Sequence, residues 1–150
     1  MKINDKKLLR EDILAALTEN PAGRRRILLV EDDPELREAL RLFLDKKYEV
    51  VGAASGGRLL EMLDSYEPIL VILDVNLPGK DGFELCRMVR ASPGHRHLPV
   101  MFLTARRDDD SFAKCIDDNA DAYLNKPFEA RELADTIERL VGPRSRSATA

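Results

Sequence analysis

One run of five apolar residues, Ile69-Leu70-Val71-Ile72-Leu73, constrains the fold of this chain more than any other feature. The run is too short for a helix, and three of its residues are β-branched, which favours a strand. Successive side chains of a strand point to opposite faces of the sheet, so a strand that is apolar at every position must be covered on both sides. The run therefore predicts a central strand of a parallel sheet packed between two layers of helices.

Four further short runs are predicted to form the other strands, at residues 27–30, 48–53, 99–103 and 122–125. Helical patterns separate these runs and follow the last one. The predicted helices start at Asp33-Pro34 and then cover residues 57–64, about 83–89, 108–117 and 129–141. Asp33 is expected to cap the first helix, whose inner face is Leu36, Leu40, Phe43 and Leu44. Strands that alternate with helices in this way are typical of the α/β class.

The two ends of the chain differ from this alternating body. Residues 6–18 place Leu9, Ile13, Ala16 and Leu17 on one face, which predicts an amphipathic helix of about three turns. Because a lone helix this short is marginal in water, it must pack on its own domain or on another chain. The sequence thus predicts three parts: an N-terminal helix with a basic linker (1–26), an α/β domain (27–141) and a flexible tail (142–150).

Charge and composition argue against several classes of function. The chain has 24 basic and 27 acidic residues, whereas nucleic-acid binders usually have a marked basic excess, so we expect no direct DNA binding. It has no apolar run long enough for a membrane span and no signal-peptide pattern, so we expect a cytoplasmic location. Cys86 and Cys115 lack CxxC spacing, which favours reduced, buried or half-buried thiols over a disulfide or metal site.

Polar side chains of particular types follow four of the predicted strands. Glu31 and Asp32 follow the first strand, Asp74 the third, Thr104 the fourth and Lys126 the fifth. The carboxyl ends of parallel strands meet at one edge of a sheet, where α/β proteins bind ligands. Close carboxylates repel one another without a cation, and their oxygens suit Mg²⁺. One carboxylate could then attack phosphorus to form an aspartyl phosphate, with the hydroxyl and the ammonium binding phosphoryl oxygens.

Four segments of the chain resemble the receiver domains of two-component response regulators. They are ILLVEDDP at 27–34, LDVNLPGKDGF at 73–83, LTA at 103–105 and LNKPF at 124–128, in the family's order and spacing. The resemblance covers about residues 27–141. It implies a doubly wound, flavodoxin-like, five-stranded parallel sheet of order 2-1-3-4-5, here with an extra N-terminal helix.

The resemblance also implies a role for each matching residue. The residues that would hold Mg²⁺ are Glu31, Asp32, Asp74 and, through its backbone carbonyl, Asn76, with Asp32 a more direct ligand than Glu31. Those that would act on the phosphoryl group are Asp74 as phosphoacceptor, Thr104 as switch hydroxyl and Lys126 as pairing ammonium. Tyr123 matches the aromatic switch position, and a cis peptide is expected at Lys126-Pro127.

Some residues depart from the family pattern or lie outside it. Asn119 stands where the family commonly has glycine, but Asn tolerates a left-handed turn better than most residues. Arg106, two residues past Thr104, sits where side chains affect access to the phosphoryl group, so the phosphate lifetime stays open. His95 and His97 lack a third ligand nearby, so a solvated loop is favoured there over a metal site.

The function that the resemblance implies is a phosphorylation-controlled signalling switch. It would not be an enzyme with an external substrate, although it would assist its own phosphorylation and dephosphorylation. A histidine kinase or phosphotransfer protein would be the donor and a downstream protein the effector, with a homodimer possible. The chain would work by binding as a stand-alone receiver, or it would be part of a longer protein.

Two other functions would use some of the same residue types. A phosphohydrolase with an aspartate nucleophile also combines Asp, Ser or Thr, Lys and Mg²⁺ at strand ends. Such enzymes usually need a second Asp two residues after the nucleophile, where this chain has Asn76, and a cap over a larger core. A degenerate receiver that serves only as a scaffold is disfavoured because every required residue type is present.

Overall fold

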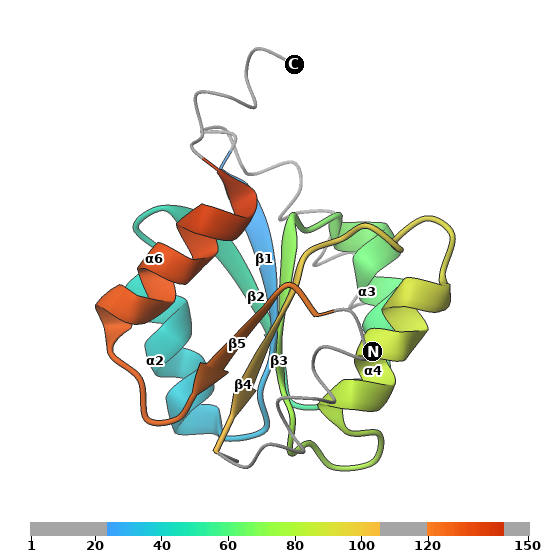
Figure 1. The fold of residues 1–150 in the computed structure, drawn as a ribbon, viewed down its shortest axis with the longest axis horizontal. Coiled ribbons are helices and arrows are strands. Elements are labelled where there is room, and N and C mark those ends of the chain that lie inside the picture. Colours follow the sequence, from blue (N-terminus) through green and yellow to red (C-terminus); the bar gives the residue numbers. More distant parts are fainter. Residues whose placement is uncertain (1–23, 106–119, 143–150) are drawn as a thin grey trace, which may run out of the picture.

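The computed structural model describes residues 24–105 and 120–142, and within these ranges strands and helices alternate as predicted (Figure 1). The strands are β1 (Arg25–Val30), β2 (Tyr48–Ala53), β3 (Leu70–Asp74), β4 (Val100–Thr104) and β5 (Ala122–Asn125). The helices are α2 (Pro34–Leu44), α3 (Leu59–Tyr66), α4 (Gly82–Ala91) and α6 (Ala130–Val141). The predicted helices at 6–18 and 108–117, residues Arg106, Cys115 and Asn119, and most of the predicted tail lie outside the described residues.

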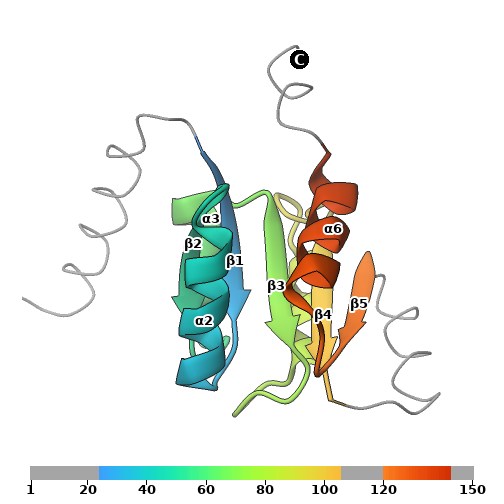
Figure 2. The same cartoon turned by 90° about the vertical axis from the view of Figure 1, so that its left-hand side faces the viewer.

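The sheet is parallel, with the strand order β2-β1-β3-β4-β5 that was predicted. Helices α2 and α6 cover one face and α3 and α4 the other, as Figures 1 and 2 show from two directions. All five residues of β3 are buried, as expected for a strand covered on both sides. The chain runs outward from β1 to β2 and then crosses back to β3, so the topological switch point lies between β1 and β3.

Several element boundaries differ from the prediction, and those of β1 and α3 differ by two residues. β1 begins two residues early because Arg25 and Arg26 pair in register with the first residues of β2. The helix predicted at 57–64 is α3 at Leu59–Tyr66 instead, since the Leu59 amide donates to the Gly56 carbonyl in a preceding turn (3.1 Å). The helix then continues to Tyr66, whose hydroxyl donates to the Glu49 carbonyl (3.1 Å).

The core consists of two apolar clusters, one on each side of the sheet. The cluster beneath α3 and α4 includes an edge-to-face contact between Phe83 and Phe102, with ring centroids 5.1 Å apart. The cluster beneath α2 and α6 includes Leu40 and Leu44 but not Phe43, which was predicted to point inward and is 37% exposed. The buried face of α2 is centred between Leu40 and Leu44, so Phe43 lies at its margin.

Two helices begin with side-chain caps at their N-termini. The Asp33 carboxylate accepts hydrogen bonds from the amides of Glu35 (3.0 Å) and Leu36 (3.5 Å), which confirms the predicted cap of α2. Asp81 and Glu84 form a reciprocal capping box at α4, with bonds of 2.9 and 3.0 Å. These caps satisfy amides that the first turn leaves unpaired and fix where each helix starts. None of the helices in the two described ranges is long and apolar enough to span a bilayer.

Candidate functional site

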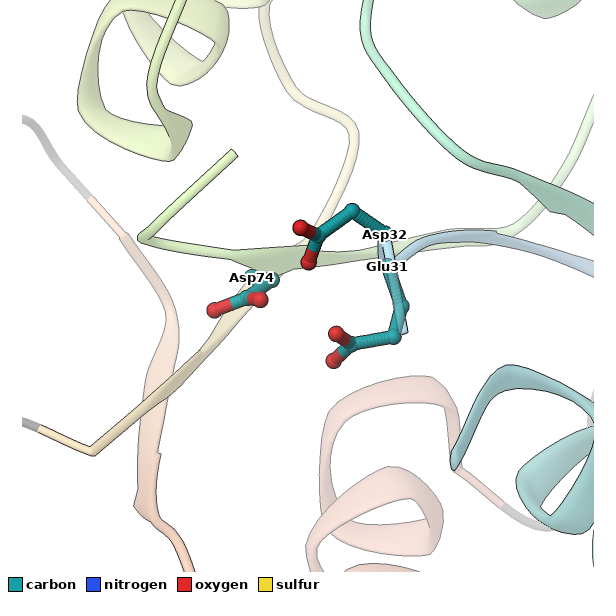
Figure 3. A group of neighbouring side chains, drawn as sticks. All are labelled: Glu31, Asp32 and Asp74. Atoms are coloured by element: carbon teal, nitrogen blue, oxygen red, sulfur yellow. The ribbon is translucent and has the colours of Figure 1, made fainter. Parts of the chain in front are cut away.

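Three carboxylates meet at the carboxyl edge of the sheet, at the switch point between β1 and β3. Glu31 and Asp32 directly follow β1, and Asp74 ends β3. One ligand oxygen from each lies within 4.8 Å of the others, and the three side chains point into a common space (Figure 3). The strand order therefore brings Asp74 next to an acidic pair that lies 42 and 43 positions before it in the sequence.

These carboxylates differ sharply in their exposure to solvent. Glu31 is fully buried and Asp74 is 3% exposed, whereas Asp32 is exposed. A buried charge is costly unless it is paired and hydrogen-bonded. The site therefore has to compensate Glu31 and Asp74 from within the protein, while Asp32 faces water.

Lys126 compensates both buried carboxylates at once. Its Nζ lies 2.9 Å from Glu31 Oε1 and 3.3 Å from Asp74 Oδ2. The residue directly follows β5, and its amide donates to the Thr104 carbonyl at 2.7 Å, which ties the ends of β4 and β5 together. The Lys126-Pro127 peptide is cis, as expected.

Backbone amides complete the hydrogen bonding of the two buried carboxylates. The Asp33 amide donates to Glu31 Oε2 (3.2 Å), and the Asn76 amide donates to Asp74 Oδ1 (3.1 Å). Arg37 Nη1 also donates to the Glu31 carbonyl (2.7 Å), which holds the loop between β1 and α2. The sequence analysis did not identify Arg37. The one signal that could have indicated this residue is its position in the first turns of the helix that follows the acidic pair.

The electrostatics of the site show an excess of negative charge. Burial raises the pKa of Glu31 from its usual 4.5 to about 7; the hydrogen bonds from Lys126 and the Asp33 amide oppose this rise, and Asp74 adds to it. Burial disfavours the charged form of Lys126, but the hydrogen bond to Glu31 and the charge of Asp74 outweigh burial and raise its pKa. One ammonium thus serves two carboxylates, with Asp32 beside them. Such a set of hard oxygen donors fits a divalent cation.

Thr104 and Tyr123 lie on the same face of the sheet. Thr104 is fully buried at the end of β4. Phe102 pairs with Tyr123 in the β4–β5 register, and paired or alternate residues of parallel strands share a face. Tyr123 is half-buried against the cluster that contains Phe102. The geometry is compatible with the predicted switch, and the roles of the two residues stay predictions.

Gly82, the first residue of α4, packs against the backbone of Asp74. A Cβ at this position would lie 2.5 Å from the Asp74 carbonyl oxygen, and the Gly82 amide donates to the Val75 carbonyl at 3.0 Å. Sequence reasoning did not identify Gly82 as part of the site. The signal that could have indicated it is the presence of glycine in the first turn of a helix, where most other residues favour the helix more than glycine does.

The cysteine and histidines outside the site are placed as follows. Cys86 is buried within α4, as predicted for a buried residue. His97 is exposed, as expected for a solvated loop, but His95 is 18% exposed at its side chain and lies 2.7 Å from Asp64 Oδ1. The loop position of His95 next to the exposed end of α3 explains this pairing. In the part of the chain that the structure describes, the one group of potential metal ligands is the three carboxylates.

Comparisons with known proteins agree with this geometry. The family model described as "Response regulator receiver domain" matches residues 27–138. The transcriptional regulatory protein AfsQ1 of Streptomyces coelicolor is 40% identical over 124 residues, which are 82% of this chain and 54% of that protein. The chain spans about half the length of the curated relatives that it matches first.

Two solved structures share the fold closely. The crystal structure of a putative response regulator from Chloroflexus aurantiacus matches with a TM-score of 0.76 and 37% identity, over 81% of this chain and all of that one. The BeF3-activated N-terminal receiver domain of Klebsiella pneumoniae RstA matches with a TM-score of 0.73 and 32% identity, over 79% of this chain and all of that one.

Proposed function

Because the chain belongs to the response regulator receiver domain family, a family of phosphorylation-controlled switches, we propose that it accepts a phosphoryl group on Asp74. The observation that carries the proposal is the arrangement around Asp74. Its carboxylate is nearly buried and lies 3.3 Å from Lys126 Nζ, in a group of three carboxylates that fits a divalent cation. A nucleophile, a cationic partner for the phosphoryl group and a metal site are thus within one small space.

In the proposed reaction, one carboxylate oxygen of Asp74 bonds to phosphorus, and the bond from phosphorus to the donor's leaving atom breaks with its electron pair. Glu31, Asp32, Asp74 and the backbone carbonyl of Asn76 would hold Mg²⁺, which when bound neutralises charge on the phosphoryl oxygens. Lys126 would exchange one of its carboxylate contacts for a phosphoryl oxygen. The Thr104 hydroxyl would donate to another phosphoryl oxygen.

The chain is a phosphoacceptor, not an enzyme that turns over an external substrate. Asn76 stands two residues after Asp74, where a phosphohydrolase of this type would need an acid–base aspartate. The structure adds that the Asn76 amide donates to Asp74 Oδ1, so this position holds the acceptor in place through its backbone. We propose that the same residues assist both phosphorylation and dephosphorylation of the chain.

Phosphorylation of the native chain by acetyl phosphate tests this function. With Mg²⁺ present, intact-mass measurement should show one added phosphoryl group that hydroxylamine removes, as it does from acyl phosphates. Chelating the metal should prevent the modification. Sustained turnover of an aryl phosphate without accumulation of modified protein would instead indicate a phosphohydrolase.

We propose a histidine kinase or a phosphotransfer protein as the donor and a downstream protein as the effector, both acting in the cytoplasm, where kinases draw on ATP.

The proposed division of the chain is a receiver domain at 27–141 between an N-terminal part at 1–26 and a tail at 142–150, and the family match to 27–138 supports it. Several longer relatives are named as DNA-binding regulators. For this chain the proposed output is a change in protein contacts, with homodimer formation as one form of it, and no direct DNA contact.

Thr104→Ala should separate phosphorylation from signalling. The hydroxyl is proposed to respond to a group that adds roughly −1.5 to −2 charges, and Tyr123, on the same sheet face, would follow its movement. The variant should still form the acyl phosphate but lose most of the phosphorylation-dependent change in partner binding or dimerisation, measured by sedimentation with and without beryllofluoride. A variant that responds like the parent would remove Thr104 from the switch.

The affinity of the site for Mg²⁺ should rise with pH. A carboxyl whose pKa is higher in the folded than in the unfolded protein stabilises the fold at pH below 4.5 and loses that contribution as pH rises through about 7. The free energy of unfolding of the metal-free protein should thus fall as pH rises from 4.5 to about 7. Mg²⁺ competes with the Glu31 proton, so its affinity should increase by up to about tenfold for each pH unit gained below pH 7.

Calorimetric titration with Mg²⁺ at pH 6 and pH 8 measures this effect. The exposed Glu35, in the first turn of α2, provides a matched control, because Glu35→Gln should keep the pH dependence of the parent. Glu31→Gln should remove most of it. Equal affinities of the parent at the two pH values would contradict the role of Glu31.

A further inference from the structure

An apolar groove lies between α2 and α6. These two helices cover the same face of the sheet, as Figure 2 shows. It has a volume of about 170 Å³ and is lined by Phe43, Leu44, Tyr48 and Ala134, with Lys46 and Lys47 at its rim. Phe43, one of the lining residues, is 37% exposed. An apolar groove with an exposed aromatic side chain in its lining can bind another apolar element.

The chain enters its described part beside this groove. The Arg24 guanidinium donates to the Asp45 carbonyl, and its Nη2 lies 3.5 Å from Asp45 Oδ1. Asp45 stands between two groove residues, Leu44 and Lys46. Only residues 19–23 separate Arg24 from the predicted helix at 6–18, and the six Cα–Cα steps from residue 18 to Arg24 span at most roughly 21 Å. The predicted helix is therefore tethered close to the groove.

The sequence of residues 6–18 complements the groove in polarity. Leu9, Ile13 and Leu17 form an apolar stripe at helical spacing, which needs an apolar partner. A short linker gives an effective concentration in the millimolar range, which favours a groove on the same chain over one on a second copy at micromolar protein.

We propose that residues 6–18 dock as a helix into this groove of their own chain, with Leu9, Ile13 and Leu17 against Phe43, Leu44 and Tyr48. The groove lies at the start of β2, whereas the carboxylates lie at the opposite edge of the sheet. A six-residue strand separates the two edges by roughly 20 Å. The docking therefore does not depend on the proposed phosphorylation, and either proposal can fail alone.

The docking can be tested with two variants of the whole 150-residue chain. Each variant carries a new aspartate, one on each of two opposite faces of the predicted helix. Ile13→Asp places a carboxylate on the apolar stripe, and Ala15→Asp places one on the outer face. Ile13→Asp should shift the amide resonances of residues 43–48 and 134–138, and Ala15→Asp should leave them near their positions in the parent. Equal spectra of the groove in all three proteins would overturn the proposal.

Filling the groove provides an independent test that leaves the helix sequence intact. Ala134→Arg should speed amide hydrogen exchange of residues 9–17 by at least about tenfold, because the helix loses its partner. Asp135→Arg, at the exposed neighbouring position, should change it little. Unchanged exchange in Ala134→Arg would contradict the docking. The proposal would also be overturned if the parent sediments as a dimer and its groove resonances shift on dilution. That result would identify a second copy of the chain as the occupant of the groove.

Discussion

Replacement of Asp74 by asparagine is expected to abolish acyl-phosphate formation completely. An amide is not a competent nucleophile toward phosphorus, yet it has nearly the same shape as the carboxylate and can still accept the hydrogen bond from the Asn76 amide. The fold should therefore persist while the chemistry is lost. Intact-mass analysis after treatment with acetyl phosphate and Mg²⁺ measures the loss, and binding of beryllofluoride should disappear in parallel.

Asp33→Asn is the matched control for this experiment. Asp33 follows the acidic pair directly, but its side chain caps α2 and is not one of the three clustered carboxylates. Asparagine caps helices about as well as aspartate, so this variant should be phosphorylated like the parent. If Asp74→Asn is modified as fully as the parent, the phosphoacceptor is another residue and the site has been assigned wrongly.

Replacement of Lys126 by methionine should have the second largest effect. The ammonium lies within 3.3 Å of both buried carboxylates and is the proposed partner of a phosphoryl oxygen. Removal of one such donor from a preorganised site typically slows the reaction by a hundredfold or more. We therefore expect phosphorylation to be roughly a hundred times slower, as measured from the time course of the intact mass.

The same variant should also change stability in a metal-dependent way. Without the ammonium, Glu31 and Asp74 face each other uncompensated, which should cost about 1–3 kcal/mol of unfolding free energy in metal-free buffer. Saturating Mg²⁺ should restore part of this loss. Denaturant titration of parent and variant, each with chelator and with Mg²⁺, measures both effects.

Lys47→Met provides the control for Lys126→Met. Lys47 also pairs with a glutamate, at 3.2 Å from Glu138 Oε2, but both side chains are largely exposed. Exposed pairs contribute between zero and about 1 kcal/mol, and this one is remote from the carboxylates. The control should keep the parent's phosphorylation rate. Equal rates in Lys126→Met and Lys47→Met would exclude Lys126 from the reaction.

The sequence was sufficient to predict which residues gather at the carboxylate site. Parallel strands place their carboxyl ends at one edge, so Glu31, Asp32 and Asp74 had to converge once 27–30 and 69–73 were identified as strands. The cap at Asp33 was predictable for a similar reason, because it depends on residues within one turn. Local patterns and topology together were enough for these features.

Features that depend on tertiary packing were not predictable in the same way. Phe43 belongs to the apolar stripe of α2, but how far a stripe is buried depends on where α6 lies. Arg37 reaches the Glu31 carbonyl through a side chain whose direction no pattern specifies. His95 pairs with Asp64, which is 31 positions away, only because the loop before β4 passes α3.

The close packing of Gly82 on Asp74 has a consequence for how a signal can leave the site. The first residue of α4 is separated from the Asp74 carbonyl by less than the space of one methyl group, and its amide donates to the carbonyl of Val75, the residue that follows the strand. The strand end and the helix start are thus mechanically coupled. Any shift of the Asp74 main chain toward α4 is therefore expected to move the start of that helix as well.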